Sequence, residues 1–175
     1  MLKNIQDVAL IKNEDVKNPF LDKMHRIESY DISHLSGKEV YGSMAVFENG
    51  EPNTSEYRIF KIKKDKNNDL KNLGEVIIRR FKHGEWQSPD LVVIDGGKPQ
   101  IDYLKKVFAK LNINSILIGI SKYGGDKIVY SQKYKKEFKE SLESNKKVFL
   151  QSRDEAHRFA NRFRNKRLEI RNKII

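Results

Sequence analysis

The stretch that most constrains the fold is Leu91-Val92-Val93-Ile94-Asp95-Gly96-Gly97-Lys98. Four apolar residues without polar alternation indicate a strand that is covered on both faces, as in a mostly parallel sheet. Asp95 then lies at the carboxyl end of that strand, where open α/β sheets place their ligands. The two glycines equally suit a turn that Asp95 merely begins. This stretch alone therefore leaves a ligand-binding and a structural interpretation open.

A second aspartate lies in an earlier stretch of alternating polarity. A period of two over 26–33 separates two faces, with Ile27, Ser29, Asp31 and Ser33 on one and Glu28, Tyr30 and Ile32 on the other. Aspartate is depleted in strands and is costly to bury without a partner. Asp31 therefore requires a partner, which a metal ion or a buried arginine would supply.

The order of the predicted elements indicates the fold class. Strands over 26–33, 40–47 and 55–62, with an Asn-Gly turn between the last two, form three sequential antiparallel strands. The later elements are a helix over about 69–83, the strand 91–95, a helix with Pro99 in its first turn, a strand over 115–120, a short strand over 128–130 and a helix over 153–170. This order predicts an α/β fold of the ribonuclease H-like type, a five-stranded mixed sheet flanked by helices. Residues 134–145 are expected to be a surface helix or an ordered insertion, residues 1–24 a lead-in segment, and residues 25–175 a single domain.

Composition restricts the partners and the chemistry. Lys and Arg total 35 against 24 Asp and Glu, and the net charge of +11 favours nucleic acid, with an anionic membrane surface as the alternative. No apolar run approaches the ~20 residues of a membrane span, and the first residues lack a signal peptide's apolar segment, so we expect a cytoplasmic protein. The chain has no cysteine, so a metal must be held by carboxylate, imidazole or backbone oxygen.

Three segments in order carry a resemblance to a known family. They are Arg26-Ile27-Glu28-Ser29-Tyr30-Asp31-Ile32-Ser33-His34, Val92-Val93-Ile94-Asp95-Gly96-Gly97-Lys98 and Arg153-Asp154-Glu155-Ala156-His157-Arg158-Phe159-Ala160. Together they resemble the carboxyl-terminal endonuclease domain of UvrC, the bacterial nucleotide excision repair nuclease, over roughly residues 20–167. Shorter matches are Glu56-Tyr57-Arg58, Glu75 with Arg79-Arg80-Phe81, and Gly119-Ile120-Ser121-Lys122. Three ordered motifs are far more specific than a single one.

The resemblance implies a ribonuclease H-like endonuclease that cuts the damaged strand on the 5′ side of a lesion. It places the catalytic residues at Asp31, Asp95 and His157, and the same three residues are expected to hold a divalent metal, Mg or Mn. If the strands that carry the two aspartates are neighbours, they lie about 4.8 Å apart, so the carboxylates converge on one metal or bridge two. The alternatives are structural aspartates in turns or salt bridges, and a His157 that is an acid, a base or merely hydrogen-bonded at the edge of an apolar stripe.

Basic residues are expected to contact DNA. The candidates are Lys98, Arg58, Arg79, Arg80, Arg153, Arg158 and Arg162. From Arg153 to Lys173 there are eight Lys or Arg against three acidic residues, a run that is usually a solvated face but that would track a DNA backbone beside a phosphodiester site. The expected partners are damaged double-stranded DNA and the UvrB–DNA complex, with no membrane, and the protein is expected to be a monomer.

The chain departs from the family pattern in two ways. Pro99 precedes Gln100 where the family usually continues with glycine, which leaves the aspartate in place. The amino-terminal nuclease module, the UvrB-contacting segment and the tandem helix-hairpin-helix of the full-length family are not found, so we expect an excised domain or a short relative. The rival function is a non-catalytic nucleic-acid-binding module or a scaffold for a repair complex, against which the intact Asp31, Asp95 and His157 argue.

Overall fold

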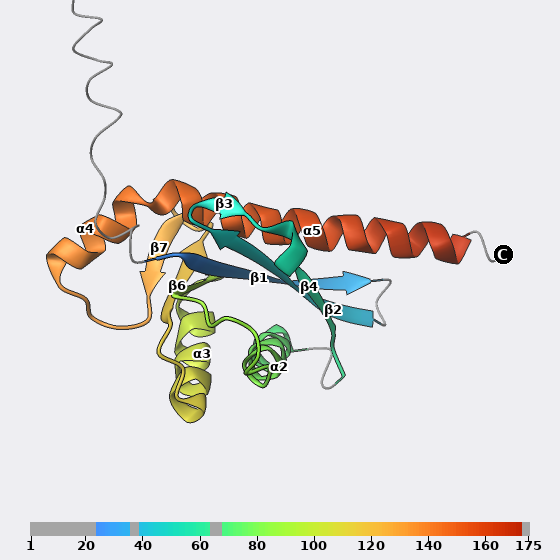
Figure 1. Ribbon diagram of the computed structural model, residues 1–175, viewed down its shortest axis with the longest axis horizontal. Helices are drawn as coiled ribbons and strands as arrows, with labels where there is room; N and C mark the ends of the chain where they lie inside the picture. Colours follow the sequence, from blue (N-terminus) through green and yellow to red (C-terminus); the bar gives the residue numbers. More distant parts are fainter. Residues whose placement is uncertain (1–23, 36–38, 64–67, 173–175) are drawn as a thin grey trace, which may run out of the picture.

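The computed structural model describes residues 24–35, 39–63 and 68–172 (Figure 1). At its centre is a seven-stranded sheet in the order β3-β2-β1-β5-β6-β7, with β4 also paired to β2. The strands are β1 (Arg26–Leu35), β2 (Glu39–Glu48), β3 (Glu51–Pro52), β4 (Arg58–Lys61), β5 (Leu91–Asp95), β6 (Ile116–Ser121) and β7 (Lys127–Tyr130). The lead-in segment expected over 1–24 lies, apart from Met24, outside the described residues.

Strand direction identifies the fold class. β1 and β2 are antiparallel, and so are β2 and β4. β5 runs parallel to β1, and β6 runs parallel to β5. The path β4-β2-β1-β5-β6 is therefore the mixed five-stranded arrangement of the ribonuclease H-like fold, and the predicted fold class is confirmed. β3 extends the sheet beside β2 and β7 extends it beside β6.

Helices cover both faces of this sheet (Figure 1). α2 (Asp69–Phe81) and α3 (Lys98–Leu111) lie on one face. The long α5 (Lys146–Asn172) crosses the other face and extends past the strands, and α4 (Lys136–Ser144) directly precedes it. Pro99 lies in the first turn of α3, as expected, and the stretch 134–145 contains α4.

Alternation along the strands separates two cores. Ile27, Leu91 and Val93 belong to the cluster under α5, whereas Val92 and Ile94 belong to the cluster under α2 and α3. None of these side chains is more than 1% exposed. The apolar run 91–94 is therefore covered on both faces, which is why it carries no polar residue.

Two predicted elements differ from the structure. The third strand was expected over 55–62, but residues 54–56 form the 3-10 helix η2 (Thr54–Glu56), and β4 is shorter. The ring of Tyr57 packs edge-on against Phe159 of α5, so this part of the chain turns towards the helix. α5 begins at Lys146 rather than near 153 because its buried stripe starts at Phe149 and continues through Ser152 and Ala156.

Candidate active site

Asp31 and Asp95 lie on neighbouring strands. The parallel pairing of β1 with β5 matches Tyr30 with Ile94, the residues directly before the two aspartates. Because side chains alternate along a strand and neighbouring strands lie about 4.8 Å apart, both carboxylates lie on the α5 face of the sheet. The side chain of Asp31 is 13% exposed and that of Asp95 is 25% exposed. The strands that carry the two aspartates are therefore neighbours, as the convergence of their carboxylates on a metal would require.

His157 reaches this pair from α5. Its Nδ1 atom lies 3.6 Å from Oδ2 of Asp31, and its side chain is 59% exposed. The Oγ atom of Ser43, the β2 residue paired with Asp31, donates a hydrogen bond of 3.0 Å to the carbonyl oxygen of Ala156. The residue that directly precedes His157 is therefore anchored to the strand beside Asp31.

Small side chains allow α5 to approach the sheet this closely. Ser152 and Ala156 are fully buried in the contact. The Oγ atom of Ser29 donates to Oγ of Ser152 at 2.7 Å, and Ser152 donates in turn to the carbonyl oxygen of Phe149 at 2.9 Å, so both buried hydroxyls are satisfied. A larger residue at either position would lift α5, and with it His157, away from the carboxylates.

The electrostatics of the site favour a cation at Asp31. Burial raises the pKa of the Asp31 carboxyl, His157 and a hydrogen bond from Ser33 oppose this shift, and the nearby charge of Asp95 adds to it. The net result is a pKa above the usual value, because the positive charge around this carboxylate is insufficient to offset its desolvation.

Lys122 supplies a cation to the other carboxylate. Its Nζ atom lies 2.8 Å from Oδ2 of Asp95, and this hydrogen bond and charge raise the pKa of Lys122. The residue was part of a family-like segment, but sequence reasoning assigned it no role. The position of Lys122 near Asp95 nevertheless follows from the strand pairing, because Asp95 pairs with Ile120 of β6 and Lys122 directly follows that strand.

Donor chemistry determines whether a divalent metal fits here. Carboxylate oxygens suit magnesium and manganese, and imidazole suits manganese better than magnesium. Asp31 and Asp95 fit such an ion by donor type and by strand position. However, no group of three or more His, Asp or Glu side chains among the described residues is arranged to hold a metal. The expected ligand set of Asp31, Asp95 and His157 is thus not assembled in this conformation, in which Lys122 binds Asp95.

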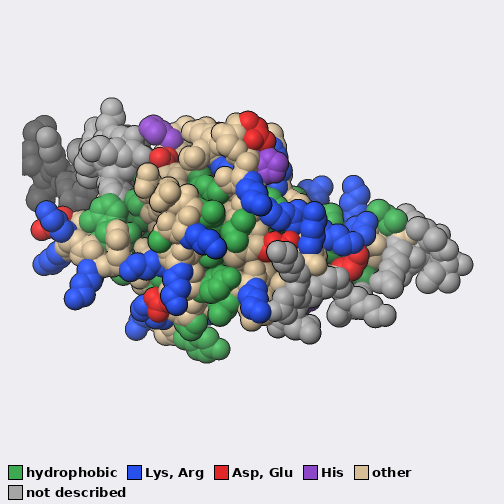
Figure 2. Space-filling view, turned by 90° about the horizontal axis from the view of Figure 1, so that it is seen from below, with side chains coloured by type: hydrophobic (Ala, Val, Ile, Leu, Met, Phe, Trp, Pro, Cys, Tyr) green, Lys and Arg blue, Asp and Glu red, His purple; other side chains and the backbone are tan. Residues whose placement is uncertain are grey.

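Three of the candidate DNA contacts are exposed on the helices next to the carboxylates. Lys98, at the start of α3, is 67% exposed and pairs with Asp102. Arg158 is 57% exposed and donates from Nε and Nη2 to Glu155. Arg162 is exposed one turn further along α5. Lys and Arg side chains gather towards the projecting end of this helix (Figure 2), where the exposed residues are Arg162, Arg164, Lys166 and Arg167.

Arg153 and Arg80, two further candidate DNA contacts, are mostly buried in ion pairs. The Arg153 side chain is 11% exposed, and its guanidinium donates to Asp126 at 2.6 Å and to Asp154 at 2.7 Å. Arg80 is 1% exposed and lies on the opposite face of β1, where its Nη2 atom donates to Oε1 of Glu28 at 2.8 Å. Both guanidinium groups are bound to carboxylates and largely shielded from solvent, whereas Arg158 and Arg162 are exposed.

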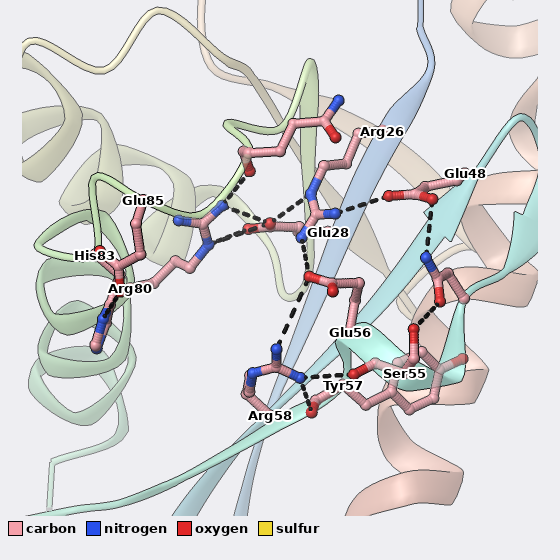
Figure 3. Close-up of polar contacts among 12 residues, drawn as sticks. Arg26, Glu28, Glu48, Ser55, Glu56, Tyr57, Arg58, Arg80, His83 and Glu85 are labelled. Atoms are coloured by element: carbon pink, nitrogen blue, oxygen red, sulfur yellow. Dashed lines mark hydrogen bonds and ion pairs between the residues drawn. The ribbon is translucent and has the colours of Figure 1, made fainter.

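Arg80 belongs to a buried network around Glu28 (Figure 3). Glu28 is fully buried and accepts hydrogen bonds from Arg26 at 3.0 Å and from the hydroxyl of Tyr30 at 2.6 Å in addition to Arg80. Burial and the charge of Glu28 raise the pKa of Tyr30 well above its usual value, so this hydroxyl keeps its proton. A buried carboxylate persists only when it is paired in this way.

Arg58 and Arg79 also lie on the α2 side of the sheet. Arg58 lies over the ring of Trp86 at 5.0 Å and donates to the carbonyl oxygens of Ser55 and Tyr57. Arg79 donates to the carbonyl oxygen of Lys61 at 2.6 Å. The structure therefore brings neither arginine to the carboxylates.

The strand order and the helices on both faces define the ribonuclease H-like class of α/β domains. The chain belongs to the family of the UvrC RNAse H endonuclease domain, whose model matches residues 19–161. The family resemblance carried by the three sequence motifs is confirmed.

Two relatives are the UvrABC system protein C of Symbiobacterium thermophilum and that of Clostridium novyi. The first is 35% identical over 169 residues and the second 36% over 184, and these matches cover 78% and 91% of this chain. The chain spans only 26% and 27% of the length of these relatives. Among solved structures, the chain is similar to Ciona intestinalis Endonuclease V (D234N) in complex with an inosine-containing 23mer DNA, with a TM-score of 0.42, 13% identity, and coverage of 71% of this chain and 64% of the other.

Proposed function

We propose that this domain is a divalent-metal-dependent DNA endonuclease that makes the 5′ incision in nucleotide excision repair. The observation that carries the proposal is the position of Asp31 and Asp95 on adjacent strands beneath His157, in a member of the UvrC nuclease domain family. Two carboxylates at neighbouring strand positions can hold the metal ions that hydrolyse a phosphodiester bond.

Each residue of the site has a distinct role in this proposal. Asp31 and Asp95 would hold magnesium or manganese, which when bound activates water and stabilises the leaving oxygen. Lys122 orients the Asp95 carboxylate through its 2.8 Å contact with Oδ2. His157 is exposed enough to meet a substrate, and it orients water or moves a proton at Nδ1 or Nε2.

The basic surface supports a nucleic-acid substrate. Lys98, Arg158 and Arg162 are exposed on helices beside the carboxylates, and the chain carries a net charge of +11. These side chains would neutralise phosphates on either side of the cleaved bond. The proposed partners are damaged double-stranded DNA and the UvrB–DNA complex, with the domain acting as a monomer in the cytoplasm. No described helix has the length and apolar character needed to cross a membrane.

One observation favours a second candidate function, a non-catalytic DNA-binding module or scaffold. Lys122 binds the Asp95 carboxylate, and within the described part of the chain no three-ligand group is in place. In this alternative the Lys122–Asp95 ion pair is a permanent structural contact and the basic surface acts alone.

Cleavage of a lesion-bearing duplex by the full chain reassembled with its repair partners separates the two candidates. We expect Asp31→Asn and Asp95→Asn each to abolish 5′ incision in magnesium or manganese while DNA affinity stays close to that of the wild type. Asp69→Asn is the matched control, because this exposed carboxylate on α2 pairs with His34 away from the site. Undiminished incision by either site variant rules out the two-aspartate site.

A further inference from the structure

The turn that joins β6 to β7 lies at the edge of the candidate active site. It comprises residues 122–126, between the end of β6 at Ser121 and the start of β7 at Lys127. Gly124, Gly125 and Asp126 all have positive φ angles, of 80°, 86° and 53°, so the chain reverses tightly here.

Both ends of the turn are tethered to the site. At one end, Nζ of Lys122 lies 2.8 Å from Oδ2 of Asp95. At the other end, Oδ1 of Asp126 accepts a hydrogen bond of 2.6 Å from Nη1 of Arg153. Arg153 lies one helical turn before His157 on α5, so the two project from the same side of the helix. The turn is therefore held between the strand that carries Asp95 and the helix that carries His157.

Tyr123 lies between these two tethers and is 92% exposed. Single exposed apolar side chains are ordinary on protein surfaces, so exposure alone signifies little. Leu111 and Ile170, the other exposed large hydrophobic residues in the described ranges, are only 36% and 47% exposed. Tyr123 differs from both because it directly follows the lysine that binds a candidate catalytic carboxylate.

We propose that Tyr123 stacks on an unpaired nucleobase next to the phosphodiester bond that is cut. The inference rests on the proposed endonuclease function and specifies how its substrate is positioned. Every base offers a π face to an aromatic ring, but only when it is not stacked within a duplex. Lys122, the first residue of the turn, and Lys127, which directly follows it, would place positive charge where the phosphates of the same strand pass. Tyr123 would thus be a positioning residue that favours distorted or locally opened DNA.

The test uses the full chain with Asp31→Asn, so that DNA is bound without being cut. The probe is a duplex with a short unpaired bubble that carries 2-aminopurine at successive positions, beside a fully paired duplex of the same sequence. We expect fluorescence quenching at one bubble position with Tyr, Phe or Trp at 123. Tyr123→Ala should lose that quenching and bind the bubble about tenfold more weakly, with little change for the paired duplex. Leu111→Ala, which replaces another exposed apolar residue, is the control. In the chain with Asp31 intact, manganese affinity should be the same for Tyr and Ala at 123.

The outcomes separate this inference from the proposed function. If the parent chain binds DNA but Tyr123→Ala leaves bubble affinity and quenching unchanged, the stacking role is wrong while the endonuclease proposal stands. Equal weakening for bubble and paired duplex, without a fluorescence change, also overturns stacking, because a phosphate or protein contact would then explain it. If the parent chain binds neither duplex, both the endonuclease proposal and this inference fail.

Discussion

Nζ of Lys122 lies 2.8 Å from Oδ2 of Asp95, so an ammonium group binds one oxygen of a carboxylate that is proposed to hold a metal ion. The lysine side chain is 65% exposed and has room to leave. A cation that binds Asp95 would share the carboxylate with this ammonium or displace it, and the ion pair is therefore expected to compete with metal binding.

Removal of the competing ammonium should tighten metal binding. Because exposed ion pairs contribute up to about 1 kcal/mol, we expect Lys122→Met to raise manganese affinity roughly two- to fivefold. Isothermal titration of the chain with manganese in the absence of DNA measures this directly. Lys98→Met is the control, since Lys98 pairs with Asp102 instead. A weaker affinity in Lys122→Met would show that the lysine organises the site rather than competing for it.

Burial of the Asp31 carboxyl should make stability depend on pH. Its pKa is raised in the folded protein, so the folded state favours the protonated form. The associated stability is fully present below the unfolded pKa of about 3.9 and is lost as pH rises through the raised folded value. Asp31→Asn should therefore raise the melting temperature at pH 7 in EDTA, by an amount that shrinks towards pH 4. If Asp31→Asn melts below the wild type at pH 7, ionised Asp31 is stabilised by contacts other than those described.

Because Arg80 belongs to the buried network around Glu28, its substitution should reduce the stability of the fold strongly without weakening DNA binding by the folded protein. Arg80→Ala leaves the buried Glu28 with fewer partners, so we expect a loss of about 3 kcal/mol in the free energy of unfolding. Urea denaturation measures the change, and Arg158→Ala, in which an exposed pair is lost, should change stability little. Folded Arg80→Ala should bind DNA like the wild type. If it is stable but binds DNA weakly, Arg80 becomes exposed in the complex.

DNA affinity should fall steeply with salt. With roughly three to six phosphate contacts, the slope of log affinity against log salt should be near −3 to −5 on an undamaged duplex. Arg158→Ala and Arg162→Ala should each reduce its magnitude by about 0.9 if the residue meets a phosphate, whereas Arg79→Ala should not. The measurement is a titration between low and physiological salt. A slope near zero would assign the +11 charge to solubility or to another partner.

The role of His157 can be resolved by substitution. If His157 is a metal ligand or orients water, His157→Asp should keep partial activity and shift the preference between magnesium and manganese. If His157 is instead an acid or base, His157→Asp should be inactive, and His157→Ala should slow incision by about 10² or more. Incision rates from pH 5.5 to 8.5 with each metal separate the two roles. Wild-type rates in His157→Ala would reduce the site to two aspartates.

Local sequence patterns determined much of the secondary structure and the fold class of this domain. The apolar run 91–94 indicated a strand covered on both faces, and the alternation over 26–33 placed Asp31 on the face away from Glu28, because side-chain period depends only on backbone geometry. The order of elements indicated the ribonuclease H-like fold, and three ordered motifs indicated the family. In each of these inferences the information lies within a few neighbouring residues or in their linear order.

The tertiary structure decided which charged groups meet. Arg80 and Arg158 are both arginines on helices, yet one is buried against Glu28 and the other is exposed beside Glu155. Likewise, Lys122 reaches Asp95, and Arg153 reaches Asp126 rather than solvent. The sequence does not reveal which partner a charged residue has, because the pairing depends on how distant strands and helices pack. The sequence by itself thus determined the elements and the candidate catalytic residues, whereas packing decided which cations are exposed and which cation binds Asp95.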